Sequence, residues 1–125
     1  MLLDSNIIIY AAQPQHEALR RFIAANPAAV SAISYVEVLG YHNLTDDAGR
    51  DLTQFFQAAR VLPLDQPVLD HAVSLRQRRR MSLGDSLVAA TALVHGLTLV
   101  TRNTVDFRAI EGLSLHDPLA STQSP

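Results

Sequence analysis

Short apolar segments alternate with helix-like patterns along this chain of 125 residues. Runs of consecutive apolar residues are typical of buried strands, and they lie at 1–3, 29–33, 61–64, 97–101 and 113–116. Between them, apolar residues recur with helical spacing over 16–25, 34–39, 47–60, 65 to about 80, and 82–95. This alternation predicts an α/β domain with a mostly parallel central sheet of about five strands.

Local signals indicate where several of these elements begin and end. Asp65 is a good helix N-cap, Pro67 is tolerated in a first helical turn, and Gly96 is a good C-cap. The apolar run 7–10 either extends the first strand or begins a helix. No linker or repeat divides the chain, so we expect one domain over residues 1–120 and a disordered tail over 121–125.

Composition narrows the class of protein. Hydrophobic residues make up 48% of the chain, enough for a proper core, and the absence of cysteine excludes disulfides, thiolate zinc sites and cysteine nucleophiles. All ten basic residues are arginine, which binds phosphate with a planar fork, although a GC-rich genome favours the same bias. We see neither a signal peptide nor an apolar stretch of ~18 residues, so we expect a soluble cytoplasmic protein.

Four acidic residues lie at the ends or starts of apolar segments that are far apart in the sequence: Asp4, Glu37, Asp85 and Asp106. The carboxyl ends of parallel strands meet at one edge of a sheet, where ligands bind. Carboxylates that meet there repel and raise each other's pKa. A divalent cation such as Mg²⁺ removes that cost. The pattern therefore indicates a metal site suited to the attack of water on phosphorus.

Each acid also has a purely structural interpretation. Asp4-Ser5-Asn6 is a good turn and helix-cap sequence. Glu37 and Asp85 each follow a serine by three residues, which matches the capping box. Asp106 lies in a polar segment that we expect to be a loop, where a lone acid carries little information. The apolar run 86–94 predicts a buried helix, and an acid at its head needs a partner.

Four segments taken together carry a family resemblance. They are MLLDSN (1–6), SYVE (34–37), GDSLVAATA (84–92) and LVTRNTVDF (99–107). In this order they resemble the motifs of the PIN-domain ribonucleases, most closely the VapC-type toxins of bacterial toxin–antitoxin pairs. The resemblance implies a three-layer α/β/α domain, a homodimer, and Mg²⁺- or Mn²⁺-dependent cleavage of RNA. It also implies a small DNA-binding, VapB-like antitoxin that covers the active site.

The resemblance assigns roles to particular residues. Asp4, Glu37 and Asp85 match the acidic metal-site positions, and Ser5 and Thr101 match the supporting hydroxyl positions. With Ser5, we expect Asn6 to set the geometry of the first turn.

This chain departs from the family at the fourth acidic position. Many relatives have an acid two residues after the threonine, where this chain has Asn103. We expect Asn103 near the metal, with Asp106 supplying negative charge.

Arginines near these motifs are candidates for RNA contact. The densest basic cluster ends five residues before Asp85 and consists of Arg76, Arg78, Arg79 and Arg80. It either balances a helix dipole on a solvated face or binds RNA phosphates, in which case salt should weaken binding. Arg102, which follows the threonine, is the better single candidate for contact near the scissile bond.

Two other classes of function remain open from the sequence. A receiver-like signalling domain shares the size and the acids at strand ends, but it resembles this chain less, because such domains have paired acids near the start and a lysine after the last strand. A catalytically inactive PIN-like binding domain is the second alternative. The acids at positions 4, 37 and 85 argue against it.

Overall fold

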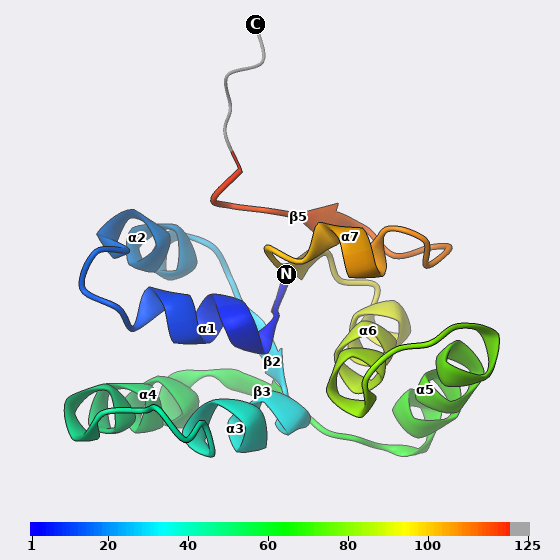
Figure 1. Cartoon of the computed structure of the whole chain (residues 1–125), viewed down its shortest axis with the longest axis horizontal. Coiled ribbons are helices and arrows are strands. Elements are labelled where there is room, and N and C mark those ends of the chain that lie inside the picture. The colour runs from blue at the N-terminus through cyan, green and yellow to red at the C-terminus, as the bar shows by residue number, and fades with distance from the viewer. Residues whose placement is uncertain (121–125) are drawn as a thin grey trace, which may run out of the picture.

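The computed structural model describes residues 1–120, and the predicted disordered tail, 121–125, lies outside these residues (Figure 1). In chain order, the elements are β1 (Leu2–Leu3), α1 (Ser5–Ala11), α2 (Glu17–Ala25), β2 (Ala29–Ser31), α3 (Ala32–Leu39), α4 (Asp46–Ala58), β3 (Arg60–Leu62), α5 (Gln66–Arg78), α6 (Leu83–His95), β4 (Leu99–Val100), α7 (Thr104–Phe107) and β5 (Leu115–His116). No helix in the described part of the chain is long and apolar enough to cross a membrane.

The five strands form one parallel sheet in the order β3-β2-β1-β4-β5. The central strand β1 pairs with β2 on one side and with β4 on the other, so that Leu3 lies opposite both Val30 and Val100. The strand order reverses direction between β1 and β4, and open α/β sheets bind ligands at the carboxyl ends of strands at such a switch point. The predicted α/β fold is confirmed.

Helices cover both faces of the sheet, and alternate strand residues supply two separate cores. Leu2 and Leu99 pack with α5, α6 and the residues around Phe107. The next residues, Leu3 and Val100, pack with α1 to α4 on the opposite face. Successive strand side chains point to opposite faces, so both faces are apolar. Figure 1 shows α1, α2 and α4 on one side of the strands and α5 and α6 on the other, which confirms three layers.

The helix α6 is buried as its apolar sequence predicts. Every residue from 86 to 92 is buried, including Ser86 and Thr91. Thr91 donates to the Leu87 carbonyl at 2.7 Å and so satisfies its hydroxyl inside the core. Gly96 ends the helix in the left-handed region at φ 63°, where a residue without Cβ is favoured. The Asp65 side chain caps α5 by accepting from the Val68 N–H, as predicted.

The boundary between the second strand and its helix is corrected by the structure. The predicted strand 29–33 ends at Ser31, and the helix begins at Ala32 rather than at Ser34. Ser31 is the N-cap, because its Oγ accepts from the Ile33 N–H at 3.3 Å. Ser34 therefore lies inside α3, and the capping-box interpretation of Ser34 and Glu37 is wrong.

Other boundaries move by one or two residues. The run 7–10 belongs to α1, which settles that alternative in favour of a helix. The fourth predicted helix ends at Arg78 rather than near 80, and the strands are shorter than their apolar runs. The polar segment that contains Asp106 is the short helix α7 rather than a loop.

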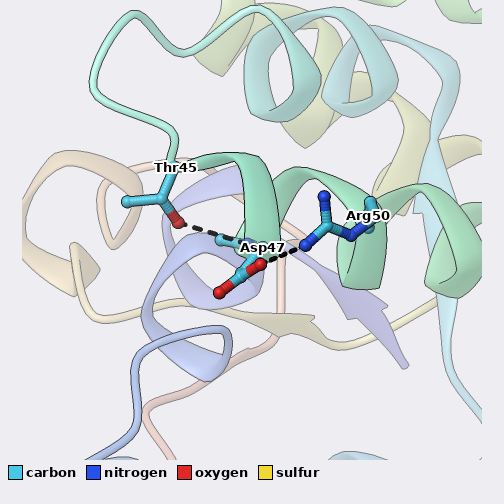
Figure 2. A network of polar contacts seen from close by, with 4 residues as sticks. Thr45, Asp47 and Arg50 are labelled. Carbon is cyan, nitrogen blue, oxygen red and sulfur yellow. Dashed lines mark hydrogen bonds and ion pairs between the residues drawn. The ribbon is translucent and has the colours of Figure 1, made fainter.

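The surface helix α4 is held at its start by local polar contacts (Figure 2). The Thr45 Oγ accepts from the Ala48 N–H at 3.2 Å, and Asp47 bonds with Arg50 one turn later. Asp46 and Asp47 lie in the first turn, where negative charge is favourable for the helix dipole. These contacts orient a helix whose buried face, Leu52 and Phe56, joins the core.

We expect Thr45→Ala to lower the free energy of unfolding by about 1 kcal/mol, because the N-cap bond is lost. The matched control is Thr53→Ala on the same helix, where the exposed hydroxyl bonds the Gly49 carbonyl and alanine favours the helix. Urea denaturation of both variants measures the difference. Equal losses at the two positions would contradict the capping role of Thr45.

Candidate functional site

Asp4 lies directly after the central strand, at the switch point of the sheet. Its backbone N–H donates to the Val100 carbonyl at 2.9 Å, which continues the pairing of β1 with β4. The residue is buried and occupies the N-cap position of α1, but its side chain makes no capping bond. Its Oδ2 accepts instead from the Thr101 hydroxyl at 2.8 Å. Asp4 therefore stands at the helix-cap position, as its sequence context predicts, but its carboxylate does not cap the helix.

Thr101 connects Asp4 to the loop that carries the fourth position of the motif. It is fully buried, and its Oγ accepts from the Asn103 N–H at 2.9 Å. The Asn103 side chain in turn donates to the Asp106 carboxylate at 2.8 Å. Asn103 and Asp106 thus lie together, and Asn103 orients the carboxylate of Asp106.

Two serines hold the carboxylate of Glu37 on α3. The Ser5 Oγ lies 2.7 Å from the Glu37 Oε1 and 2.8 Å from the Ser34 Oγ. A hydroxyl has one proton and a carboxylate has none, so Ser5 donates to Glu37 and accepts from Ser34. Ser34 is a site residue that the sequence analysis missed. Its three-residue spacing from Glu37, read as a capping box, in fact places both side chains on one helix face.

Glu37 also lies against the first turn of α6. A Cβ added at Gly84 would overlap the Glu37 Oε2 and lie 2.9 Å from its Cδ. Glycine is therefore required at position 84 for the carboxylate to occupy this place. The contact brings Glu37 next to the residue that precedes Asp85.

Asp85 combines a local and a tertiary role. Its N–H donates to the Ser82 Oγ at 3.1 Å, so Ser82 caps α6 as the sequence predicts. Its half-buried carboxyl has a raised pKa, first because of burial and then because of the charges of Glu37 and Asp106, while the Ser82 hydroxyl opposes the shift. The raised pKa indicates that Asp85 lies in the field of the other acids.

Asp4 is the most perturbed acid of the group. Burial raises the pKa of its carboxyl from the usual 3.8 to about 6, and the charges of Asp85 and Glu37 add to the increase. The hydrogen bond from Thr101 opposes this shift without reversing it. The structure therefore brings Asp4, Glu37 and Asp85 into electrostatic contact, with Asp106 coupled to Asp85.

The remaining sequence candidates lie around this group. Arg102 is exposed, and its guanidinium lies 5.3 Å from the centre of the Tyr10 ring, a cation–π contact that positions it. Tyr10 carried no signal in the sequence that would have identified this role. Asn6 is exposed, and within residues 1–120 its side chain makes no hydrogen bond, so its supporting role stays a prediction. The cluster of Arg76, Arg78, Arg79 and Arg80 lies at the end of α5.

Comparison with known proteins identifies the family to which this arrangement belongs. The sequence matches the PIN domain family over residues 1–113. The chain belongs to the PIN-domain family. This PIN domain is 30% identical to ribonuclease VapC10 of Mycobacterium tuberculosis (strain CDC 1551 / Oshkosh) over 121 residues, which cover 90% of each chain. The predicted VapC-type membership is confirmed, and the receiver-like alternative is excluded.

Solved structures support the same assignment of fold. A chain of a toxin–antitoxin complex from Klebsiella pneumoniae is 28% identical, with a TM-score of 0.74 over 94% of this PIN domain and 96% of that chain. A chain of VapBC2 from Rickettsia felis, bound to a DNA fragment from its promoter, has a TM-score of 0.80 at 21% identity. That alignment covers 92% of this PIN domain and 96% of that chain, and it shows the fold alone.

The acidic group suits a hard divalent cation in its chemistry. Carboxylate oxygens are the ligands that Mg²⁺ and Mn²⁺ prefer, and in the described part of this PIN domain no arginine or histidine forms an ion pair with Asp4, Glu37 or Asp85. The repulsion within the group is therefore not balanced by a side chain. No three acids or histidines among residues 1–120 are arranged to hold a metal ion together, and Mg²⁺ is commonly held by one or two carboxylates with water as the other ligands.

The raised pKa of Asp4 predicts a specific dependence of stability on pH in the absence of divalent cations. An unfolded carboxyl titrates near 3.8 and the folded one near 6, so the folded protein binds a proton more readily between these values. The contribution of Asp4 to stability is therefore lost as the pH rises through this window. Asp4→Asn avoids the loss.

In EDTA, we expect the free energy of unfolding of Asp4→Asn to rise relative to that of wild type as the pH goes from 4 to 7. The change in this difference should be on the order of 3 kcal/mol. Urea denaturation at the two pH values gives the difference. If the free energy of unfolding of Asp4→Asn does not rise relative to wild type with increasing pH, the carboxylate of Asp4 is not destabilised by its surroundings.

The contact between Gly84 and Glu37 predicts that two helical glycines respond differently to alanine. Gly49 in α4 has open space, with only the Leu44 Cδ2 at 3.7 Å from an added Cβ, so Gly49→Ala should stabilise by about 0.5–1 kcal/mol. Gly84→Ala should not stabilise the protein in this way, because its methyl group displaces the Glu37 carboxylate.

When Glu37 is already alanine, Gly84→Ala should stabilise the protein as Gly49→Ala does. The coupling energy between positions 84 and 37 should then be about 1 kcal/mol. If the effects of Gly84→Ala and Glu37→Ala on thermal unfolding simply add, the contact between these residues is contradicted.

Proposed function

We propose that this PIN domain is an endoribonuclease toxin that hydrolyses RNA phosphodiester bonds with Mg²⁺ or Mn²⁺. The observation that carries the proposal is the meeting of Asp4, Glu37 and Asp85, from three separate elements, at the switch point of the sheet. Their mutual repulsion is tolerated without a basic side chain to balance it, which favours a cation as the missing partner. The name of the M. tuberculosis relative, a ribonuclease, supports RNA as the substrate.

Each carboxylate has a proposed role. Asp4 and Asp85 bind the cation directly, and Glu37 either binds it through water or orients the attacking water. A cation bound there supplies a more acidic water and neutralises the charge that develops on the phosphate. Thr101 holds the Asp4 carboxylate in one orientation, and Ser5 does the same for Glu37.

Three residues around the site, Arg102, Asn103 and Asp106, are proposed to add negative charge near the cation and to contact the RNA. The Asn103 side chain orients the Asp106 carboxylate through their hydrogen bond. In this proposal, the two residues together take the place of the fourth acid that many relatives have at position 103. Arg102, held over Tyr10, is placed to bind a phosphate near the scissile bond. We expect this activity in the cytoplasm.

We also propose that an antitoxin protein regulates the activity. The Klebsiella neighbour is a toxin–antitoxin complex, and the Rickettsia neighbour is a VapBC complex bound to promoter DNA. A DNA-binding, VapB-like partner is therefore the proposed inhibitor. Exposed apolar residues on α3 and α5, Val36 and Val73, are compatible with the predicted homodimer.

Cleavage of labelled RNA tests the proposal directly. We expect cutting in Mg²⁺ or Mn²⁺ and none in EDTA, and we expect Asp85→Asn to lower the rate by at least about 100-fold, since an immediate metal ligand matters more than its supporting groups. The matched control is Asp51→Asn, which removes an exposed acid of α4 and should leave the rate unchanged.

Two outcomes would count against this function. Cleavage that persists in EDTA would exclude the metal-dependent mechanism. A folded wild-type protein that cuts none of several RNAs, and binds no Mn²⁺ in calorimetric titration, would favour a catalytically inactive binding domain.

A further inference from the structure

The basic charge of this chain is concentrated in one turn. Four of its ten arginines lie within residues 76–80, while the rest of the chain has six arginines against twelve acids. A polyanion is therefore repelled by most of the molecule and attracted at this turn. We propose that the turn between α5 and α6 is a binding site for backbone phosphates of the RNA substrate. This inference rests on the proposed function and adds to it the surface that holds the RNA.

The turn forms a hollow with basic walls. A cavity of about 440 Å³ is lined only by the consecutive residues 76–81, which comprise four arginines, Gln77 and Met81. No carboxylate lines it. Arg76, Arg78 and Arg80 are exposed, so their guanidinium groups are accessible to a ligand.

These guanidinium groups are not engaged within the protein. Across residues 1–120, none of the four forms an ion pair or a side-chain hydrogen bond, and the Arg79 Nε is buried without a partner. By contrast, Arg20 donates to three backbone carbonyls, and Arg50 pairs with Asp47. The exposed residues Arg76, Arg78 and Arg80 therefore have donors free for phosphate oxygens.

Balancing of the helix dipole does not explain the whole cluster. The dipole acts within the last turn of a helix, and in α5 that turn contains Arg76 and Arg78. Arg79 is the C-cap in an extended conformation, and Arg80 lies beyond it. The two residues outside the helix need another explanation, which a chain of phosphates supplies.

The basic turn leads along the chain into the helix turn that carries Asp85, because Arg80 lies only five residues before it. A second cavity, of about 350 Å³, lies between α5 and α6, and its lining is mostly apolar, with Arg76, Gln77 and Ser86 as its polar residues. Leu83 and Ser86 lie on either side of Asp85 in the first turn of α6. In this proposal, RNA bound at the arginines lies near the first turn of α6, which carries the proposed metal ligand Asp85.

RNA fits this surface better than an acidic protein segment does. Arginine binds phosphate oxygens with two parallel hydrogen bonds, and closely spaced arginines suit a ligand with one phosphate in every nucleotide. An acidic peptide would satisfy the same charges, so binding to the antitoxin is the competing outcome that the experiment must separate.

The test measures binding of a fluorescent single-stranded RNA to the full chain in EDTA, by anisotropy, from 50 to 200 mM NaCl. We expect Arg78→Gln/Arg80→Gln to weaken binding on the order of tenfold at low salt and to reduce the slope of log K against log salt by about 1.4, since two phosphate contacts are lost. Arg78→Lys/Arg80→Lys keeps the charges and should keep most of the slope. Circular dichroism confirms that each variant is folded.

The matched control is Arg21→Gln/Arg60→Gln, which removes two exposed arginines elsewhere. Arg60 begins β3 and so lies at the edge of the sheet opposite the carboxylates. This variant should bind RNA with a slope close to that of wild type. Equal losses for the two glutamine variants would overturn the proposal, as would a wild-type slope near zero.

Binding in EDTA separates this inference from the proposed function. Salt-dependent binding lost in Arg78→Gln/Arg80→Gln supports the site even if no RNA is ever cut. Unchanged RNA binding, accompanied by loss of binding to a VapB-like antitoxin, would overturn the site and assign the arginines to the protein partner.

Discussion

The pairing of β1 between β2 and β4 is the constraint on which the rest of the structure depends. Leu3 lies opposite both Val30 and Val100, so the next residue after each of these three, Asp4, Ser31 or Thr101, reaches the same edge of the sheet. The register also separates the two cores, because Leu2 and Leu3 pack on opposite faces. A slip of one residue would exchange these faces and would move Asp4 away from Thr101.

The carboxylates of this site, the buried one of Asp4 and the exposed one of Glu37, have hydroxyl donors rather than cations as partners. The Thr101 hydroxyl donates to Asp4, and the Ser5 hydroxyl donates to Glu37 and bonds with Ser34. A hydroxyl satisfies the hydrogen-bonding capacity of a carboxylate but leaves its charge in place. The negative potential at the sheet edge is therefore retained, and the raised pKa of Asp4 measures its cost to the folded protein. A site that binds cations needs this potential, which is why stability and the proposed function oppose one another here.

The first turn of α6 joins the acidic and the basic parts of the molecule. Gly84 makes room for the Glu37 carboxylate, Asp85 contributes its own, and Leu83 and Ser86 line a small cavity together with Arg76. The body of the same helix is buried over residues 86–92 and is rigid for that reason. The core of the domain thus positions a short stretch on which the proposed metal site and the proposed RNA surface both rely.

Local spacing and composition were enough to predict the alternation of strands and helices and the caps at Asp65, Ser82 and Gly96. The family was recognised from the resemblance of four motifs in series. The sequence did not determine where β2 becomes α3, since Ser31 and Ser34 are equally good caps by type. The bond between Asp4 and Thr101, which are 97 residues apart, and the link from Ser34 through Ser5 to Glu37 could be found only in the folded molecule. These contacts arise from the parallel register and the packing of α1 on α3. Local sequence preferences do not encode the distances between such elements, so their side chains meet only once the sheet has formed.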